Sequence, residues 1–315
     1  MSGSTRGSVT RSTGAFVTTD TQTLEDIGAA GRPRTGVPYL FRRLRRHPLG
    51  LAGFFAVVLL LFLGALAPWL RPYDPSSQDF ALMHAPTLAH PFGTDPLGRD
   101  IFSRVLYASR IELTVSLSAV FIGVGLAAVW GMTSGFFGGI TDSSMQRIND
   151  VWLAFPGLIL LLIITSVLGP SPRTLVIALV IGTIPGTSRI IRGAVLSEKN
   201  NVYVEAARVI GCSQPRIMFV HVLPQIIPLI IVIVSIAIPG IALLGAALSF
   251  LGLGLPPPTP SWGGDLAGES RTYFEDAPWM AIFPGLALSL TVLSFNLLGD
   301  ALRDILDPRL RGSTT

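Results

Sequence analysis

Six long apolar stretches constrain this chain more than any other feature of its sequence. The first, residues 49–67, carries no charged side chain over 19 residues. At 1.5 Å per residue this length is close to the roughly 30 Å hydrocarbon core of a bilayer. The stretches predict repeated membrane crossings, with helices at residues 49–67, 113–137, 151–168, 174–191, 222–251 and 279–298.

The composition supports the membrane class. Hydrophobic residues make up 50% of the chain and charged residues 13%, whereas an ordinary soluble domain has about 25% charged residues. Many of the 33 glycines and 24 prolines fall inside the apolar stretches, where neighbouring helices can satisfy the backbone groups that they free. We therefore predict an all-α polytopic membrane protein with six transmembrane helices.

The distribution of Arg and Lys predicts the orientation of these helices. If residues 1–47 are cytoplasmic, 17 of the 23 basic residues fall on the cytoplasmic side and six on the other. Because positive charge accumulates in cytoplasmic loops, both termini are expected in the cytoplasm. Residues 1–47 are predicted to be a disordered tail, since they lack apolar content. The tail ends in a basic cluster at residues 42–46, which either anchors the topology or binds anionic membrane lipid.

Two predicted extracytoplasmic segments are long. Residues 71–110 follow the first helix, so residues 48–110 form a unit of one helix and its outer segment. Residues 252–278 contain the run Pro-Pro-Pro-Thr-Pro-Ser-Trp-Gly. Loops of this length without secondary structure are commonly functional. Two interpretations are open: a partner-binding loop, or a loop that Pro and Trp stiffen and anchor at the membrane interface.

Several kinds of chemistry are excluded by the residues that are present. Lys199 is the only lysine and follows Glu198 rather than glycine, so the sequence has no P-loop for ATP. With Cys212 as the single cysteine, internal disulfides and CxxC zinc sites are excluded. None of the four histidines belongs to an HExxH pair, and His84 and His90 are expected to be solvated loop residues. We predict a protein that is not an enzyme and has no metal site.

Charged residues near the predicted helices offer little for proton coupling. Asp150 lies three residues after Arg147 at the start of the third predicted helix, so the two side chains can share a helix face and form an ion pair. A proton relay at Asp150 is the alternative. Glu112 and Asp300 lie at the ends of predicted helices, and no carboxylate is expected near the membrane midplane. This pattern disfavours a secondary transporter but leaves coupling to other gradients open.

The loop between the fourth and fifth predicted helices, residues 197–223, is long and polar for a connection between membrane helices. Residues 202–210 contain good helix formers, small Ala206 and Ala207 permit close approach, and Gly211 is a natural residue after a helix C-terminus. Ser213 is expected to cap a second helix with Pro215 in its first turn. The pattern predicts a cytoplasmic helix-turn-helix element, which is either a docking element or a hairpin without a partner.

The same loop resembles the EAA loop of type I ABC importer permeases. Glu205-Ala-Ala is followed after three residues by Gly211 and, after nine more, by His221-Val-Leu-Pro, close to the family pattern EAA-x3-G-x9-I-x-LP. His221 stands where the general pattern has Ile, as in the peptide-importer branch. The resemblance implies that the residues which couple the permease to an ATPase are Glu205, Ala206, Ala207, Arg208, Gly211 and Pro224.

Further motifs resemble the dipeptide, oligopeptide and nickel permeases of that family. Residues 92–100 resemble their GTD-x-x-GRD segment, and residues 256–263 their PPTPEWG loop, with Ser261 where Glu is usual. Residues 135–142 and 295–309 resemble their G-Y-F-G-G-x-x-D turn and their C-terminal pattern. The likeness spans about residues 40–310 and is strongest to the second permease of the pair. It implies an extracytoplasmic gate or binding-protein contact at Asp95, Gly98, Arg99, Asp100 and Trp262.

The resemblance implies the fold of a type I importer permease, with a core at residues 111–306, a coupling loop at residues 197–223 and a cytoplasmic tail at residues 307–315. Such a subunit forms half of a translocation pathway in the bacterial cytoplasmic membrane. It implies a homologous second permease, two cytoplasmic ATPase subunits that hold ATP and Mg, and an extracytoplasmic substrate-binding protein. No cofactor or nucleic acid is expected on this chain. Peptides are the expected substrate, with nickel, glutathione or another small solute, and then a stand-alone secondary transporter, as alternatives.

Overall fold

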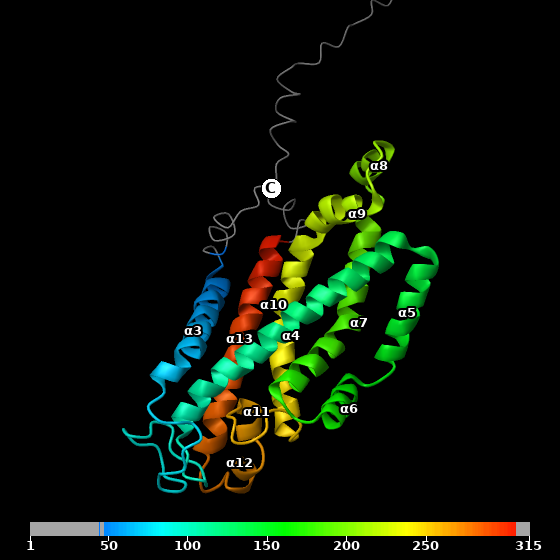
Figure 1. Ribbon diagram of the computed structural model, residues 1–315. Helices are drawn as coiled ribbons and strands as arrows, with labels where there is room; N and C mark the ends of the chain where they lie inside the picture. The colour runs from blue at the N-terminus through cyan, green and yellow to red at the C-terminus, as the bar shows by residue number, and fades with distance from the viewer. Residues whose placement is uncertain (1–43, 45–46, 307–315) are drawn as a thin grey trace, which may run out of the picture. The chain divides into compact units, whose positions relative to one another are not determined.

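The computed structural model describes Leu44 and residues 47–306, which form a bundle of helices (Figure 1). The predicted tail, apart from Leu44 and His47, and residues 307–315 lie outside the described residues. The long helices are α3 (Pro48–Leu70), α4 (Ile101–Phe137), α7 (Pro172–Glu198), α10 (Leu223–Phe250) and α13 (Trp279–Leu306). The short ones are α5 (Gly139–Leu153), α6 (Gly157–Leu168), α8 (Val202–Val209), α9 (Gln214–Arg216), the π-helix η1 (Ile217–Val222), α11 (Trp262–Asp265) and α12 (Glu269–Thr272).

The membrane-spanning elements differ from the prediction at one place. Among the described residues, five helices are long and apolar enough to cross a membrane, with α9, η1 and α10 forming one of them. The helices α5 and α6 reach this length and apolar content only when they are taken together, and the pair is bent by 84°. A continuous third helix over residues 151–168 is therefore wrong. Pro156 lies at the break and has no N–H to continue the helical hydrogen bonds of α5.

Helix α4 begins twelve residues before the predicted start at residue 113. Asp100 caps it, because its carboxylate accepts a hydrogen bond from the N–H of Ser103 at 2.8 Å. With 37 residues, α4 is about 55 Å long and exceeds the hydrocarbon core. Its first turns carry polar residues, and the apolar pattern therefore marked only its later part.

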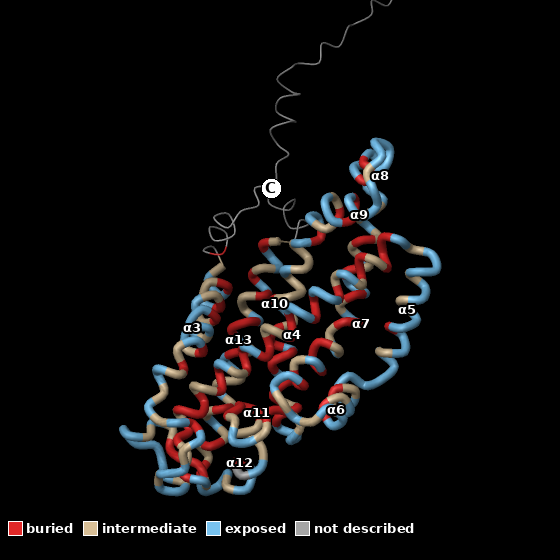
Figure 2. The backbone as a smooth tube through the Cα atoms, in the orientation of Figure 1, coloured by how far each residue is buried: buried red, intermediate tan, exposed pale blue. Residues whose placement is uncertain are grey.

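The core lies where α4, α7 and α10 meet. Leu175 and Leu179 of α7 pack with Val120 and Val124 of α4 and Leu248 of α10. Figure 2 shows these central helices as the most buried part of the bundle. The close approach of α4 to α7 needs small residues on α4: a Cβ at position 131, now glycine, would lie 2.5 Å from the carbonyl oxygen of Ser188.

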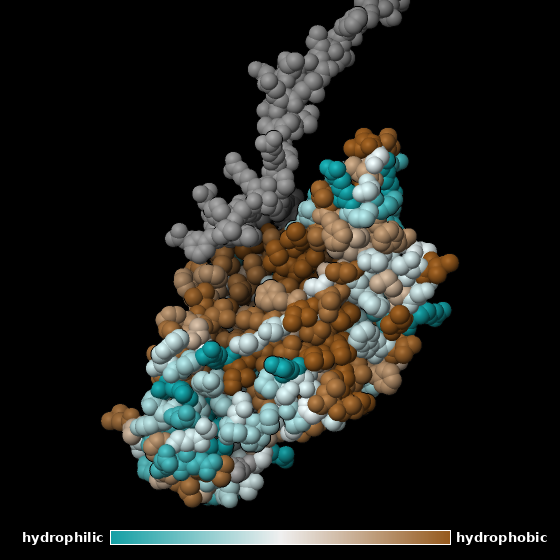
Figure 3. All heavy atoms as spheres, in the orientation of Figure 1, coloured by the Kyte–Doolittle hydropathy of each residue, from teal (hydrophilic) through white to brown (hydrophobic). Residues whose placement is uncertain are grey.

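The two ends of the bundle have different structures. One end carries α8 and α9, and α3 begins and α13 ends there (Figure 1). The opposite end carries α11, α12 and the segment between α3 and α4, and polar residues gather on it (Figure 3). Between the ends, large apolar side chains are exposed, including Phe55 and Phe62 of α3 and Leu290 of α13. This arrangement matches a membrane-crossing bundle with a separate polar structure at each end.

Candidate functional site

The predicted helix-turn-helix element lies at the α8 end of the bundle. Gly211 has a φ angle of +82°, in the left-handed region that glycine adopts without a Cβ penalty. Its N–H donates to the carbonyl of Arg208, and the N–H of Cys212 donates to the carbonyl of Ala207, both at 3.0 Å. These two bonds form a Schellman motif that ends α8. The prediction that Gly211 ends this helix is confirmed.

Helix α8 has one face on the bundle and one in solvent. Val204 and Ala207 are buried in a cluster with Ile217 and Val222, so this cluster holds α8 against η1, at the start of the membrane-spanning helix that continues as α10. Ala206 is exposed whereas Ala207 is buried, so the two alanines lie on different faces of α8. The exposed face of α8 carries Val202, Glu205, Ala206, Arg208, Val209 and Ile210.

Exposed apolar side chains mark this face as a contact surface. Val209 is 82% exposed and Ile210 78% exposed, although they sit on a polar loop. A groove beside them is lined by Lys199, Asn200, Glu205, Arg208 and Val209. A surface with apolar residues rimmed by charges is typical of protein interaction sites.

Two polar contacts hold this element on the bundle, and neither was predicted. The ammonium group of Lys199 donates to the carbonyl of Gly135 at 2.8 Å, a favourable place for a cation because this carbonyl belongs to the last turn of α4. The hydroxyl of Tyr203 donates to the carboxylate of Glu198 at 2.8 Å. Desolvation and the nearby Glu198 carboxylate raise the pKa of Tyr203 to about 12, so the hydroxyl stays a donor at physiological pH.

The second helix of the element departs from the prediction. Ser213 precedes α9 but makes no side-chain capping hydrogen bond, because Pro215 occupies a position whose N–H such a cap would use. After α9 the chain widens into η1 before α10 begins. Pro224 is the second residue of α10, and in a continuous α-helix its ring would clash with the carbonyl four residues earlier, within η1. The wider π turns avoid that clash and lead the loop into the membrane-spanning helix without a break.

At the opposite end, the segment that contains Asp95, Gly98, Arg99 and Asp100 is a closed turn. The Asp95 carboxylate accepts from the N–H groups of Leu97 and Arg99, each at 2.9 Å, and from Nε of Arg99 at 2.5 Å. The N–H of Gly98 donates to the carbonyl of Asp95 at 3.0 Å. Asp95 is buried and Asp100 fully so. These two carboxylates therefore hold the turn and the start of α4, and the gate or binding-protein contact expected at this segment stays a prediction.

Trp262 is likewise a packing residue. It is 1% exposed, and its indole Nε1 donates to the carbonyl of Val105 in α4 at 3.0 Å. It lies in a cluster with Ile101 and Met280. A side chain buried in this way offers no surface to a binding protein, whereas a role of Trp262 in a gate stays a prediction. Trp262 instead fastens α11 to α4.

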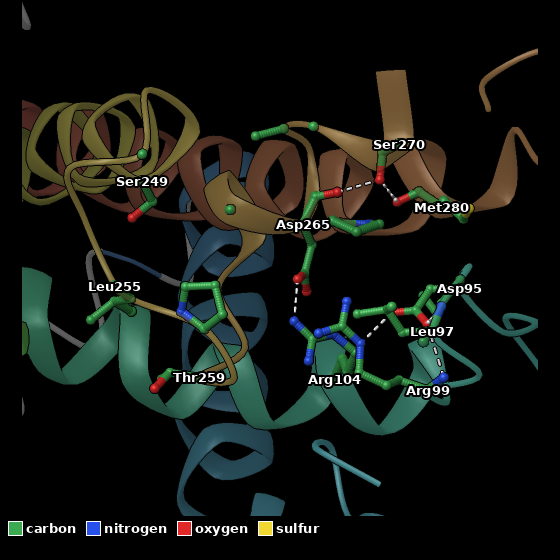
Figure 4. A pocket seen from close by; sticks show the side chains of 17 residues that line it. Asp95, Leu97, Arg99, Arg104, Ser249, Leu255, Thr259, Asp265, Ser270 and Met280 are labelled. Atoms are coloured by element: carbon green, nitrogen blue, oxygen red, sulfur yellow. Dashed lines mark hydrogen bonds and ion pairs between the residues drawn. The ribbon is translucent and has the colours of Figure 1, made fainter. Parts of the chain in front are cut away.

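Arg104 was not predicted, yet it joins three segments at this end. From α4, its guanidinium donates to the carbonyls of Pro75 at 3.0 Å and Pro258 at 3.4 Å, and it pairs with the carboxylate of Asp265 in α11. Figure 4 shows the pair on the wall of a cavity that Arg99 and Asp95 also line. A charged residue in the first turn of a long apolar helix is the signal that identifies it.

His90 also differs from the prediction. Its Nδ1 lies 2.9 Å from the carboxylate of Asp100, and its side chain is 15% exposed rather than solvated. The ring packs against Tyr73 and Phe80. Together these contacts fold the segment between α3 and α4 onto the first turn of α4. No group of three or more metal-ligating side chains occurs in the part of the chain that the structure describes.

The ion pairs at the α8 half of the bundle connect different helices. Asp150 pairs with Arg189 of α7 and not with Arg147, so the predicted pair within one helix is wrong. Asp142 of α5 accepts from Nε and Nη2 of Arg192, each at 2.5 Å. Both carboxylates connect the broken helix pair to α7. The three-residue spacing of Arg147 and Asp150, on which the predicted pair was based, carries no information about such contacts between helices.

Comparison with known proteins matches this chain to membrane permeases. Residues 123–312 match the family described as binding-protein-dependent transport system inner membrane component. Residues 39–91 match the N-terminal transmembrane domain of oligopeptide transport permease C. The glutathione transport system permease protein GsiD of Escherichia coli O6:K15:H31 (strain 536 / UPEC) is 42% identical over 281 residues, 89% of this chain and 92% of the relative. The proteins of that name from Shigella boydii serotype 4 (strain Sb227) and Escherichia coli O157:H7 are equally similar.

The family match covers more than half of the chain and includes every element from α5 to α13, while the relatives extend the likeness over nearly its whole length. The chain therefore belongs to the inner-membrane permease components of binding-protein-dependent transport systems, within the peptide and nickel branch of the ABC importers.

Proposed function

We propose that this permease forms half of a translocation pathway for short peptides of about the size of glutathione. The observation that carries the proposal is the 42% identity, over 281 residues, to permeases named for glutathione transport. The match of residues 39–91 to a domain of oligopeptide permeases also favours peptides over metal ions. As a permease of an ABC importer, the chain works with ATPase subunits, a partner permease and a binding protein, and ATP is hydrolysed on the ATPase subunits.

We place the contact with an ATPase at the exposed face of α8. Val209 and Ile210 would fill an apolar hollow of that subunit, while Glu205 and Arg208 lie at the rim. Because α8 is packed on η1 through Val204 and the other buried residues of its cluster, a movement of α8 displaces the start of α10. The proposed element thus transmits motion from the ATPase to a membrane-spanning helix as a rigid body.

The substrate class is tested by reconstituting the permease pair, the ATPases and the binding protein in proteoliposomes. ATP-dependent uptake of labelled glutathione and of di- and tripeptides is measured beside uptake of Ni²⁺. We expect saturable uptake of at least one of the peptides and none of the metal. Uptake of Ni²⁺ without uptake of any peptide would refute the proposal.

A further inference from the structure

A cavity lies at the α11 end, between the start of α4 and the segment that joins α10 to α13. Its volume is about 320 Å³, within the range of about 300–1,000 Å³ that is usual for small-molecule sites. Arg99, Arg104 and Asp265 line its polar part (Figure 4). The apolar part includes Leu255 and Met280. The cavity is therefore large enough for a short peptide or one end of it.

Most of the charged groups of the cavity are engaged within the protein. Both oxygens of the Asp95 carboxylate accept hydrogen bonds. Arg104 donates to two backbone carbonyls and pairs with Asp265. These contacts hold the walls of the cavity, and they leave little capacity for a ligand on Asp95 or Arg104.

Arg99 is the exception. Its Nε pairs with Asp95 at 2.5 Å, but within the described part of the chain neither of its Nη nitrogens has a hydrogen-bond partner. The side chain is 12% exposed, and Figure 4 shows it extending toward the middle of the cavity, beside Arg104. A planar guanidinium with two free nitrogens is suited to bind a carboxylate with two parallel hydrogen bonds.

We infer that this cavity is a substrate subsite in which Arg99 binds the terminal carboxylate of a short peptide. The inference rests on the proposed function, since it takes a peptide as the substrate. Asp95 balances the charge of Arg99 and Asp265 that of Arg104, so a zwitterionic peptide meets no net charge in the cavity. The low exposure of Arg99 strengthens the contact, because little water competes for the guanidinium.

The experiment compares tri-alanine with its C-terminal amide in the reconstituted importer, and measures KM and maximal rate of uptake for each. Any preference of the binding protein for a free carboxylate is the same with every permease variant. The quantity of interest is therefore the change in the acid-to-amide ratio of kcat/KM between variants. Arg99→Lys keeps the positive charge and the pairing with Asp95 but removes the two guanidinium nitrogens that would donate parallel hydrogen bonds to a carboxylate. We expect this ratio to fall about tenfold, mainly through KM.

The matched control is Arg71→Lys, the same change at the same end of the bundle, where Arg71 pairs with the exposed Asp74. It should leave the ratio unchanged. A second variant, Leu97→Trp, narrows the cavity from a residue that is 38% exposed without removing an ion pair, and it should raise KM for both peptides. An unchanged ratio in Arg99→Lys, an unchanged KM in Leu97→Trp, or an equal loss in the control would overturn the inference. Failure of the wild-type importer to take up tri-alanine, glutathione or any other peptide tested would instead refute the proposed function, and with it the ligand named here.

Discussion

Substitution of Gly211 by Asp separates the stability of the α8 turn from its proposed contact with an ATPase. A Cβ at this position would meet no other atom within 4 Å, so the folded chain has room for a side chain. The cost is that of placing an L-residue at a φ of +82°, about 1–2 kcal/mol and less for Asp than for most residues. Native stabilities of about 5–15 kcal/mol tolerate such a loss.

Membrane insertion and pairing with the second permease should therefore persist in Gly211→Asp. At the proposed contact, however, the new carboxylate lies beside Val209 and Ile210, where docking would bury it without a partner. Burying an unpaired charge costs several kcal/mol, and each 1.4 kcal/mol is a factor of about ten in affinity. We expect pull-down of the ATPases and ATP-driven uptake to fall by at least about a hundredfold.

Three further variants make the test specific. Gly211→Asn has nearly the same size and tolerates the left-handed region, so it should retain more uptake than the Asp variant. Gly252→Asp introduces the same residue at a φ of +81° in open space near the opposite end, and should not affect ATPase pull-down. Glu205→Lys should weaken coupling less than Gly211→Asp does, because an exposed charge stays partly solvated. Wild-type uptake and pull-down by Gly211→Asp would refute the placement of the ATPase contact on α8.

Trp262→Phe should lower the stability of the solubilised protein by about 1 kcal/mol, because it loses the indole hydrogen bond, and it should leave the KM of uptake unchanged. A raised KM at an unchanged melting temperature would contradict this and indicate a role for Trp262 in substrate entry. Asp142→Asn should lower the free energy of unfolding by about 1–3 kcal/mol, because it removes the negative charge from a bidentate contact with Arg192. Asp150→Asn, at the more exposed pair with Arg189, should lower the free energy of unfolding by no more than about 0.5 kcal/mol. Thermal unfolding that ranks the two variants in the reverse order would contradict this reasoning. The purified chain, free of partner subunits, should hydrolyse no ATP in a phosphate-release assay, because Lys199 does not belong to a P-loop. Hydrolysis that persists after removal of every ATPase subunit would refute the assignment of ATP hydrolysis to the partner subunits.

Local features of the sequence were sufficient for the class, for most of the membrane-spanning helices and for the turn at Gly211, but not for the break between α5 and α6 or the start of α4. Apolar stretches of bilayer length predict membrane-spanning helices because a chain in lipid must satisfy its backbone hydrogen bonds within itself. The end of α8 was predicted because a Schellman motif involves only neighbouring residues and needs a left-handed residue at one position. The spacing of the EAA loop pointed to the importer family for the same reason, since the whole pattern lies within one contiguous element.

Tertiary structure alone decided which residues are buried and which partners the charged groups choose. Asp150 pairs with Arg189, 39 residues away, and Arg104 with Asp265, 161 residues away. No local pattern contains such distances, because they depend on how separate helices pack. The same holds for Trp262, for which the family resemblance implied a gate or binding-protein contact, although its side chain is buried against α4. The sequence thus determined the elements of this permease, through interactions within a few residues, and packing between distant helices determined which side chains remain free to bind a ligand.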